Sequence, residues 1–125
     1  MKKVKKVIPF EFVLEQLYSA NPQIRPMFGC HAVYVRNKIV LILRNKENSI
    51  DDNGVWIATS KAHHSSLRKE LPSMRALRVF GDSSGWQNLP ASANDFEEAV
   101  LFICELILKG DPRIGKETKK SKEGK

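Results

Sequence analysis

Two apolar segments separated by a very short polar turn constrain the fold more than any other feature of the sequence. Residues 27–35 and 39–44 are rich in Val, Ile, Leu and Tyr and flank Asn37-Lys38, which predicts a tight β-hairpin. With a two-residue turn, each face of the hairpin carries four apolar side chains: Val33, Val35, Val40 and Ile42 on one face, and Ala32, Tyr34, Leu41 and Leu43 on the other. Because both faces are apolar, we expect helices or a second subunit to cover both.

The longest predicted helix spans residues 92–109. Ser92 stands three residues before Asp95, a variant of the capping box, while Gly110 suits the position just after a helix and Pro112 prevents continuation. Apolar side chains surround most of the helix: Phe96, Ala99, Val100, Leu101, Phe102, Ile103, Cys104, Leu106, Ile107 and Leu108. A helix this apolar is expected either at the centre of the fold or in an oligomer contact.

Shorter elements are predicted in the rest of the chain. A helix over 10–18 begins with Pro9 in its first turn and ends before Asn21-Pro22. The later elements are, in order, a turn at 52–54, a strand at 55–59, a helix from Ser60 to Leu71, and strands at 75–80 and 86–89. Since Pro90 follows it, the last strand suits the edge of a sheet.

This order of elements predicts the fold class. Helix, hairpin, strand, helix, hairpin and helix form an α+β pattern with no strand–helix–strand run of the parallel type. We therefore expect a two-layer fold with an antiparallel sheet of about five strands and with helices before, between and after two hairpins.

The formal net charge of +7 is concentrated at the two ends of the chain. Residues 1–8 and residues 113–125 each carry +4, so residues 9–112 carry −1. The sequence predicts a basic N-terminal arm over 1–8, a single domain over 9–112 and a basic disordered tail over 113–125. The lysines that would contact the phosphates of a nucleic acid are Lys2, Lys3, Lys5 and Lys6 in the arm, and Lys116, Lys119, Lys120 and Lys122 in the tail.

The sequence also predicts the compartment. Residues 1–8 are too short and too charged for the apolar part of a signal peptide, and the longest apolar runs, 39–43 and 99–104, are much shorter than a membrane span. We expect a soluble cytoplasmic protein with no membrane partner, in which Cys30 and Cys104 stay as free thiols.

No set of residues has the spacing of a catalytic or metal site. Residues 81–85 match the pattern G-x-S-x-G, but a strand follows them and all three histidines come earlier in the chain. Cys30 and His31 are neighbours on a predicted strand and point to opposite faces. His63 and His64 are a poor chelating pair on a helix. We expect no enzyme activity, no cofactor and no metal.

The stretch Arg25-Pro26-Met27-Phe28-Gly29, which leads directly into the hairpin, resembles the N-terminal domain family of TfoX-like proteins. The order of elements over residues 10–109 is also similar to that family. The resemblance implies a fold similar to that of secretion chaperones. It also implies a link to regulation of competence for DNA uptake, without an established catalytic residue.

Two positions depart from the family pattern, and the motif has a structural interpretation of its own. Cys30 stands where the family usually has a second glycine, and Val55-Trp56-Ile57 replaces a Leu-Tyr-Leu-like strand. We expect Met27 and Phe28 to fill the core where the chain enters the sheet. Gly29 would permit a bulge or the close approach of another backbone.

Three functions remain open from the sequence. The first is a non-enzymatic interaction or regulatory domain of the TfoX N-terminal type that forms a homodimer, because the hairpin and the last helix expose so much apolar surface; the identity of any other protein partner stays open. The second is sequence-independent nucleic-acid binding through the lysine-rich ends. The third is a small enzyme, which would need a pocket of convergent titratable groups.

Overall fold

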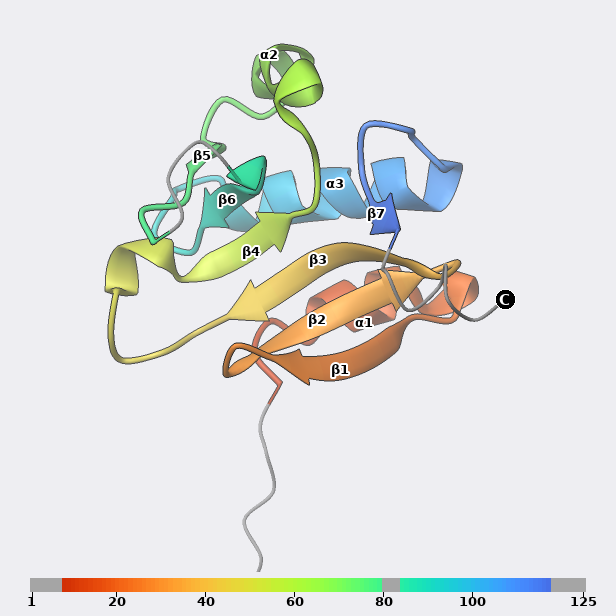
Figure 1. Ribbon diagram of the computed structural model, residues 1–125, viewed down its shortest axis with the longest axis horizontal. Coiled ribbons are helices and arrows are strands. Elements are labelled where there is room, and N and C mark those ends of the chain that lie inside the picture. The colour runs from red at the N-terminus through yellow and green to blue at the C-terminus, as the bar shows by residue number, and fades with distance from the viewer. Residues whose placement is uncertain (1–7, 80–83, 118–125) are drawn as a thin grey trace, which may run out of the picture.

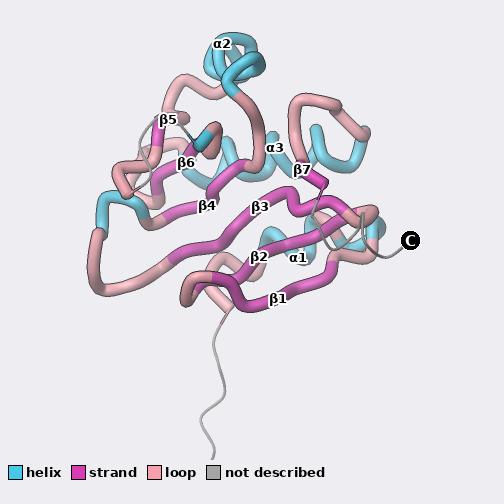
Figure 2. The backbone as a smooth tube through the Cα atoms, viewed as in Figure 1, coloured by secondary structure: helices cyan, strands magenta, loops and turns pink. Residues whose placement is uncertain are grey.

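The computed structural model describes residues 8–79 and 84–117 and has the predicted α+β class (Figure 1). An antiparallel sheet forms one layer, and helices α1 and α3 lie together behind it (Figure 2). The strands are β1 Gln23–Met27, β2 Cys30–Val35, β3 Lys38–Arg44, β4 Gly54–Ile57, β5 Arg75–Ala76, β6 Gln87–Pro90 and β7 Lys116–Glu117. The helices are α1 Phe12–Gln16, α2 Lys61–Glu70 and α3 Phe96–Lys109, with 3-10 turns at Tyr18–Ala20 and Ile50–Asp52.

The sheet has seven described strands rather than about five. Their order is β1-β2-β3-β4-β6-β5, and β7 pairs with the start of β3. The extra strands are β1, which the sequence analysis did not separate from the hairpin, and the two-residue β7. The predicted hairpin is therefore the second half of a three-stranded meander.

The predicted register of that hairpin is wrong. The turn lies at Arg36 and Asn37, whose φ angles of 54° and 69° suit a tight hairpin turn, so Val35 pairs with Lys38. Val40 is an extra residue in β3, because Val33 pairs with Leu41 while Tyr34 pairs with Ile39. As a result the side chains exchange faces: Leu41 and Leu43 join Val33, Val35 and Val40, while Ile42 joins Ala32 and Tyr34.

Both faces of the sheet are buried, as predicted. The inner core lies between the sheet and the helices, and at its centre are Val33, Leu41, Val55, Leu89 and Ile103. The outer core lies on the opposite face and includes Ala32, Ile42, Trp56, Ala58 and Leu77. Trp86 and Met27 pack against the outer core.

Most of the apolar circumference of α3 is covered within one chain, although Leu101 remains exposed. Phe96 makes tilted and edge-on ring contacts with Phe10 and Phe12, with centroids 5.1 and 6.3 Å apart, so the segment around α1 covers much of what the sheet leaves. Gly110 ends the helix with φ 77°, as predicted. The predicted capping box is absent, since Asp95 is the N-cap and has no side-chain capping bond. The apolar helix therefore does not require an oligomer.

Two other elements differ from the prediction. The first helix is shorter than 10–18, because Phe10 has φ 56° and Tyr18 already belongs to a 3-10 turn. Strand β6 lies inside the sheet, between β4 and β5, and the edge assignment is wrong. Pro90 is tolerated there because it pairs only with Gly54, beyond the end of β5.

The described fold continues past the boundary predicted at residue 112. Ile114 is buried, the Gly115 N–H donates to the Ala58 carbonyl at 2.7 Å, and β7 extends the pairing to Glu117. Thr59 Oγ1 also donates to the Arg113 carbonyl at 2.7 Å. The start of the predicted tail is therefore part of the domain, while residues 118–125 and the arm residues 1–7 lie outside the described chain.

Candidate interaction site beside Asp52

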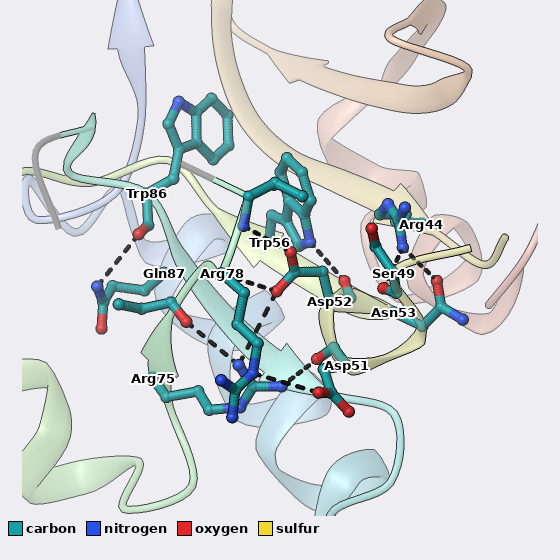
Figure 3. Close-up of polar contacts among 12 residues, drawn as sticks. Arg44, Ser49, Asp51, Asp52, Asn53, Trp56, Arg75, Arg78, Trp86 and Gln87 are labelled. Carbon is teal, nitrogen blue, oxygen red and sulfur yellow. Dashed lines mark hydrogen bonds and ion pairs between the residues drawn. The ribbon is translucent and has the colours of Figure 1, made fainter. Parts of the chain in front are cut away.

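The polar segment after β3 is held by the buried guanidinium of Arg44 (Figure 3). Arg44 donates to the Ser49 carbonyl at 2.9 Å, to Asn53 Oδ1 at 2.7 Å and to the Asn48 carbonyl at 3.0 Å. The side chain of Asn53 closes the loop by bonding both the N–H and the carbonyl of Lys46 at 2.9 Å. The chain from 46 to 53 thus has a fixed shape, although its regular secondary structure is limited to the 3-10 turn Ile50–Asp52.

Asp52 ties this loop to a segment about 26 residues later. Its fully buried carboxylate accepts hydrogen bonds from the backbone N–H groups of Arg78 and Val79, both at 2.9 Å. The Arg75 guanidinium lies 3.9 Å from the same carboxylate, and Trp56 Nε1 donates to the Asp52 carbonyl at 2.8 Å. Arg75 also donates to the Asp51 carbonyl. The buried carboxylate is therefore hydrogen-bonded to backbone and lies beside a cation, as charges buried in proteins generally are.

A hollow of about 420 Å³ opens beside this junction. Its described lining consists of Glu47, Ser49, Ile50, Asp51, Asp52, Arg78 and Val79. Ile50 is 67 % exposed and Val79 is 47 % exposed, although both are large aliphatic side chains. Arg78 and Asp51 form an ion pair at 3.3 Å on the surface of the same hollow. The site thus combines an apolar floor with charged groups on a fixed loop.

The family motif has a different role from the predicted one. Phe28 and Gly29 form the turn between β1 and β2, with φ 55° and 74°. Phe28 is 68 % exposed, so the prediction that it fills the core is wrong, whereas Met27 packs on the outer core. The Arg25 guanidinium lies 5.1 Å from the centre of the Tyr34 ring. Glycine serves at position 29 because the turn needs a positive φ.

Lys116 is part of the fold rather than of a basic tail. Its ammonium donates to the Ser84 carbonyl at 3.1 Å and lies 5.3 Å from the centre of the Trp86 ring. Burial lowers the pKa of Lys116. The other seven predicted contacts lie outside the described residues: Lys2, Lys3, Lys5, Lys6, Lys119, Lys120 and Lys122.

The thiols and histidines do not converge on a common site. Cys30 is buried in the outer core, and its thiol donates to the Phe28 carbonyl at 3.5 Å. Burial raises the pKa of Cys30, and it raises the pKa of Cys104 to about 12. His64 Nε2 lies 2.8 Å from the Gly85 carbonyl. Within residues 8–79 and 84–117, no three His, Cys, Asp or Glu side chains are grouped as metal ligands.

The predicted G-x-S-x-G loop is only partly described. Residues 81–83 lie outside the described chain. The Ser84 hydroxyl accepts a hydrogen bond from the Trp86 N–H at 3.1 Å, which is a turn contact. Strand β6 follows the loop, as the sequence analysis expected.

The Asp52 junction does not follow from the local sequence. Asp52-Asn53-Gly54 predicts only a turn, because these residue types favour turns. The available signal was the position of Asp52 directly before a buried strand, together with Arg44 at the end of another.

None of the helices in the described part of the chain has the length and hydropathy needed to cross a bilayer. Comparisons with protein-family models, with curated proteins and with solved structures found no match to this chain.

Proposed function

We propose that this chain is a non-enzymatic interaction domain of the TfoX N-terminal type, and that the hollow beside Asp52 is its interaction site. One observation carries the proposal: Ile50 and Val79 expose large aliphatic surfaces on two segments that the Asp52 carboxylate fixes to each other. Exposed aliphatic groups gain free energy when a partner removes them from water. Because the loop is already ordered, binding costs little conformational entropy.

The buried ionisable groups support a binding role rather than catalysis. Arg44 and Asp52 spend their hydrogen bonds on backbone groups and on Asn53, so neither presents a reactive group to a substrate. Both thiols have raised pKa values through burial, so at neutral pH they are protonated and weakly nucleophilic. The TfoX assignment rests on the motif Arg25-Pro26-Met27-Phe28-Gly29 and on the order of elements.

The occupant that fits the hollow is the N-terminal arm of a second copy. The arm places Val4 and Val7 among lysines, and the hollow offers aliphatic walls beside the Glu47 carboxylate and the Asp51–Arg78 ion pair. Two copies that exchange arms make the same contact twice, which gives a closed dimer with two-fold symmetry. This route to a homodimer needs neither the sheet faces nor α3, most of whose apolar surface is covered within one chain.

The first test compares full-length variants by light scattering and sedimentation at several protein concentrations. Ile50→Ser should shift the dimer to monomer, because it removes the apolar floor. Tyr18→Ser is the matched control, since Tyr18 is 81 % exposed but lies in the 3-10 turn after α1, and it should leave the dimer unchanged. A wild-type chain that stays monomeric at high concentration, or a dimer unaffected by Ile50→Ser, would exclude arm exchange at this site.

A second experiment measures the arm directly. A fluorescent peptide of residues 1–7 should bind the full-length chain, and binding should be weaker to Ile50→Ser than to Tyr18→Ser. Changing all four arm lysines of the full chain to glutamine should also weaken the dimer, because it removes the attraction to Glu47. Equal binding of the peptide to both serine variants would rule out the hollow as its site.

Nucleic-acid binding through the ends is the second candidate, favoured by the density of lysine in them. The test is fluorescence anisotropy of labelled duplex DNA and single-stranded RNA at low and moderate salt. If the ends bind phosphates, the affinity falls steeply as salt is added. It also falls when the four arm lysines are changed to glutamine, whereas Ile50→Ser has no effect. The Ile50 variant therefore separates this candidate from arm exchange.

A further inference from the structure

A second cavity, of about 200 Å³, lies where the β2–β3 turn meets the C-terminal end of α3. The segment that leads from α3 to β7 forms its third side. Its floor consists of four buried aliphatic side chains, Val35, Val40, Ile107 and Ile114.

The mouth of this cavity carries two cationic side chains. Arg36 donates to the Ile107 carbonyl at 3.3 Å and to the Leu108 carbonyl at 3.5 Å, which uses only part of its five-donor guanidinium. Lys38 is exposed beside it, and no ion pair joins Lys38 to a residue of the described chain. Glu117 stands opposite Lys38 in the β3–β7 pair and offsets part of this charge.

The carboxylate at the mouth, Asp111, is already paired with an arginine. Asp111 accepts hydrogen bonds from Arg113 Nε at 3.0 Å and from its terminal nitrogen at 2.7 Å. These side-chain bonds hold the pKa of Asp111 below its ordinary value, so it is ionised and paired. Arg36 and Lys38, which form no ion pair within the described chain, therefore carry the positive charge beside the aliphatic floor of the cavity.

We propose that this cavity binds a small organic anion, with its apolar body among Val40, Ile107 and Ile114 and its carboxylate against Arg36 and Lys38. The volume sets the size of the body. At about 30 Å³ for each non-hydrogen atom, the volume that one water has in the liquid, the cavity holds about six or seven atoms. A carboxylate with a short aliphatic chain of about five carbons matches both the floor and the mouth. This site is separate from the hollow beside Asp52 and shares no lining residue with it.

The test uses the full-length chain and three probes of equal length: hexanoate, hexan-1-ol and hexylammonium. Methyl NMR spectra should show saturable shifts at Val35, Val40, Ile107 and Ile114 with hexanoate. Hexanol should bind about tenfold more weakly, because it lacks the charge-assisted bonds, and hexylammonium should not bind. Equal shifts with all three probes, or no saturable shift at these methyls with hexanoate, would overturn the proposal.

Two variants locate the anion contact. Lys38→Gln and Arg36→Gln should each weaken hexanoate binding several-fold and leave hexanol binding unchanged. Lys61→Gln, an exposed lysine at the start of α2, is the matched control and should have no effect. If Arg36→Gln disturbs the end of α3, Lys38→Gln alone decides, because its side chain is exposed. Unchanged hexanoate affinity in Lys38→Gln would remove the charged mouth from the site.

Discussion

The inner face of the sheet packs against α1 and α3, whereas the outer face is covered by Leu77, Trp86 and the polar junction around Asp52. The inner side is mainly apolar, with Gln87 as a buried polar side chain, and its elements follow from helical and strand periodicity. The outer side buries Arg44, Asp52 and Asn88, so its shape depends on individual hydrogen bonds. One face of the sheet is thus covered mainly by general apolar packing, and the other by specific polar contacts. The exposed hollow lies on the polar side, where the chain is fixed outside regular secondary structure.

The largest expected effect comes from filling the close contact at Gly54, where β4 begins. Gly54 has φ 148°, and an added Cβ would lie 2.1 Å from the Leu89 carbonyl oxygen and 2.7 Å from Asn88 Oδ1. Backbone cannot give way there without breaking the β4–β6 pairing, so Gly54→Ala should lose more than about 4 kcal/mol of unfolding free energy. Urea denaturation measures the loss.

Gly110→Ala is the matched control for Gly54→Ala. Gly110 also has a positive φ, of 77°, but nothing lies within 4 Å of its added Cβ. Only the backbone conformation is penalised, so the expected loss is about 1 kcal/mol. Equal losses in the two variants would mean that close packing at β4–β6 contributes nothing.

The second prediction breaks the polar junction itself. Asp52→Ala leaves the N–H groups of Arg78 and Val79 without the buried carboxylate that accepts from them, and it leaves Arg75 without its acidic partner. The expected loss is about 3 kcal/mol, since a hydrogen bond to a charged group contributes about 1.5–3 kcal/mol. The measurement is chemical denaturation monitored by Trp fluorescence.

Asp51→Ala tests whether the effect belongs to burial rather than to charge. Asp51 is the neighbouring acid, and its ion pair with Arg78 is exposed on both sides. The loss should stay below about 0.5 kcal/mol. A loss in Asp52→Ala as small as that in Asp51→Ala would show that the outer side does not depend on the buried carboxylate.

The class and the order of elements were predictable, because they depend on apolar periodicity that each segment carries by itself. The register was not, because Val40 had to be recognised as an extra residue and Arg36 as a turn residue with φ 54°. The Asp52 junction was also hidden, since its partners lie about 26 residues away and the local sequence favours a turn. Lone Ile114 in a polar stretch gave no sign that the domain continues, yet its burial anchors β7.

The third prediction concerns the one buried amide of the outer side that lacks a partner. In the described chain, neither Asn88 Oδ1 nor Nδ2 has a hydrogen-bond partner, although the residue is fully buried opposite Trp56. Replacing such a group with an apolar one of similar shape removes the desolvation cost. Asn88→Leu should therefore gain about 1.5 kcal/mol of unfolding free energy.

Gln87→Leu is the control from the adjacent residue of β6. Gln87 is equally buried, but its Oε1 accepts a hydrogen bond from Arg68 at 2.8 Å. Its replacement should destabilise by about 1–3 kcal/mol, because the arginine loses its acceptor. If Asn88→Leu also destabilises, the Asn88 amide is satisfied by a bound water or ligand.

The smallest expected effect distinguishes the two cores through their thiols. Cys104 lies in the inner core, where burial raises its pKa to about 12, and Cys30 lies in the outer core, where Arg44 and Lys46 partly offset the same effect. Because the folded pKa of Cys104 exceeds the unfolded value near 9, the folded state retains a proton that the unfolded state loses above that pH. The stabilisation is complete below the unfolded pKa and is lost as the pH rises towards 12, by about 1 kcal/mol at pH 10. Urea unfolding at pH 8 and pH 10 measures how much unfolding free energy is lost between the two pH values. Cys104→Ala should lose less than wild type, and Cys30→Ala should differ from wild type by a smaller amount. The same dependence in both variants would mean that apolar burial and polar burial desolvate a thiol equally, and that the cationic groups near Cys30 do not reach it.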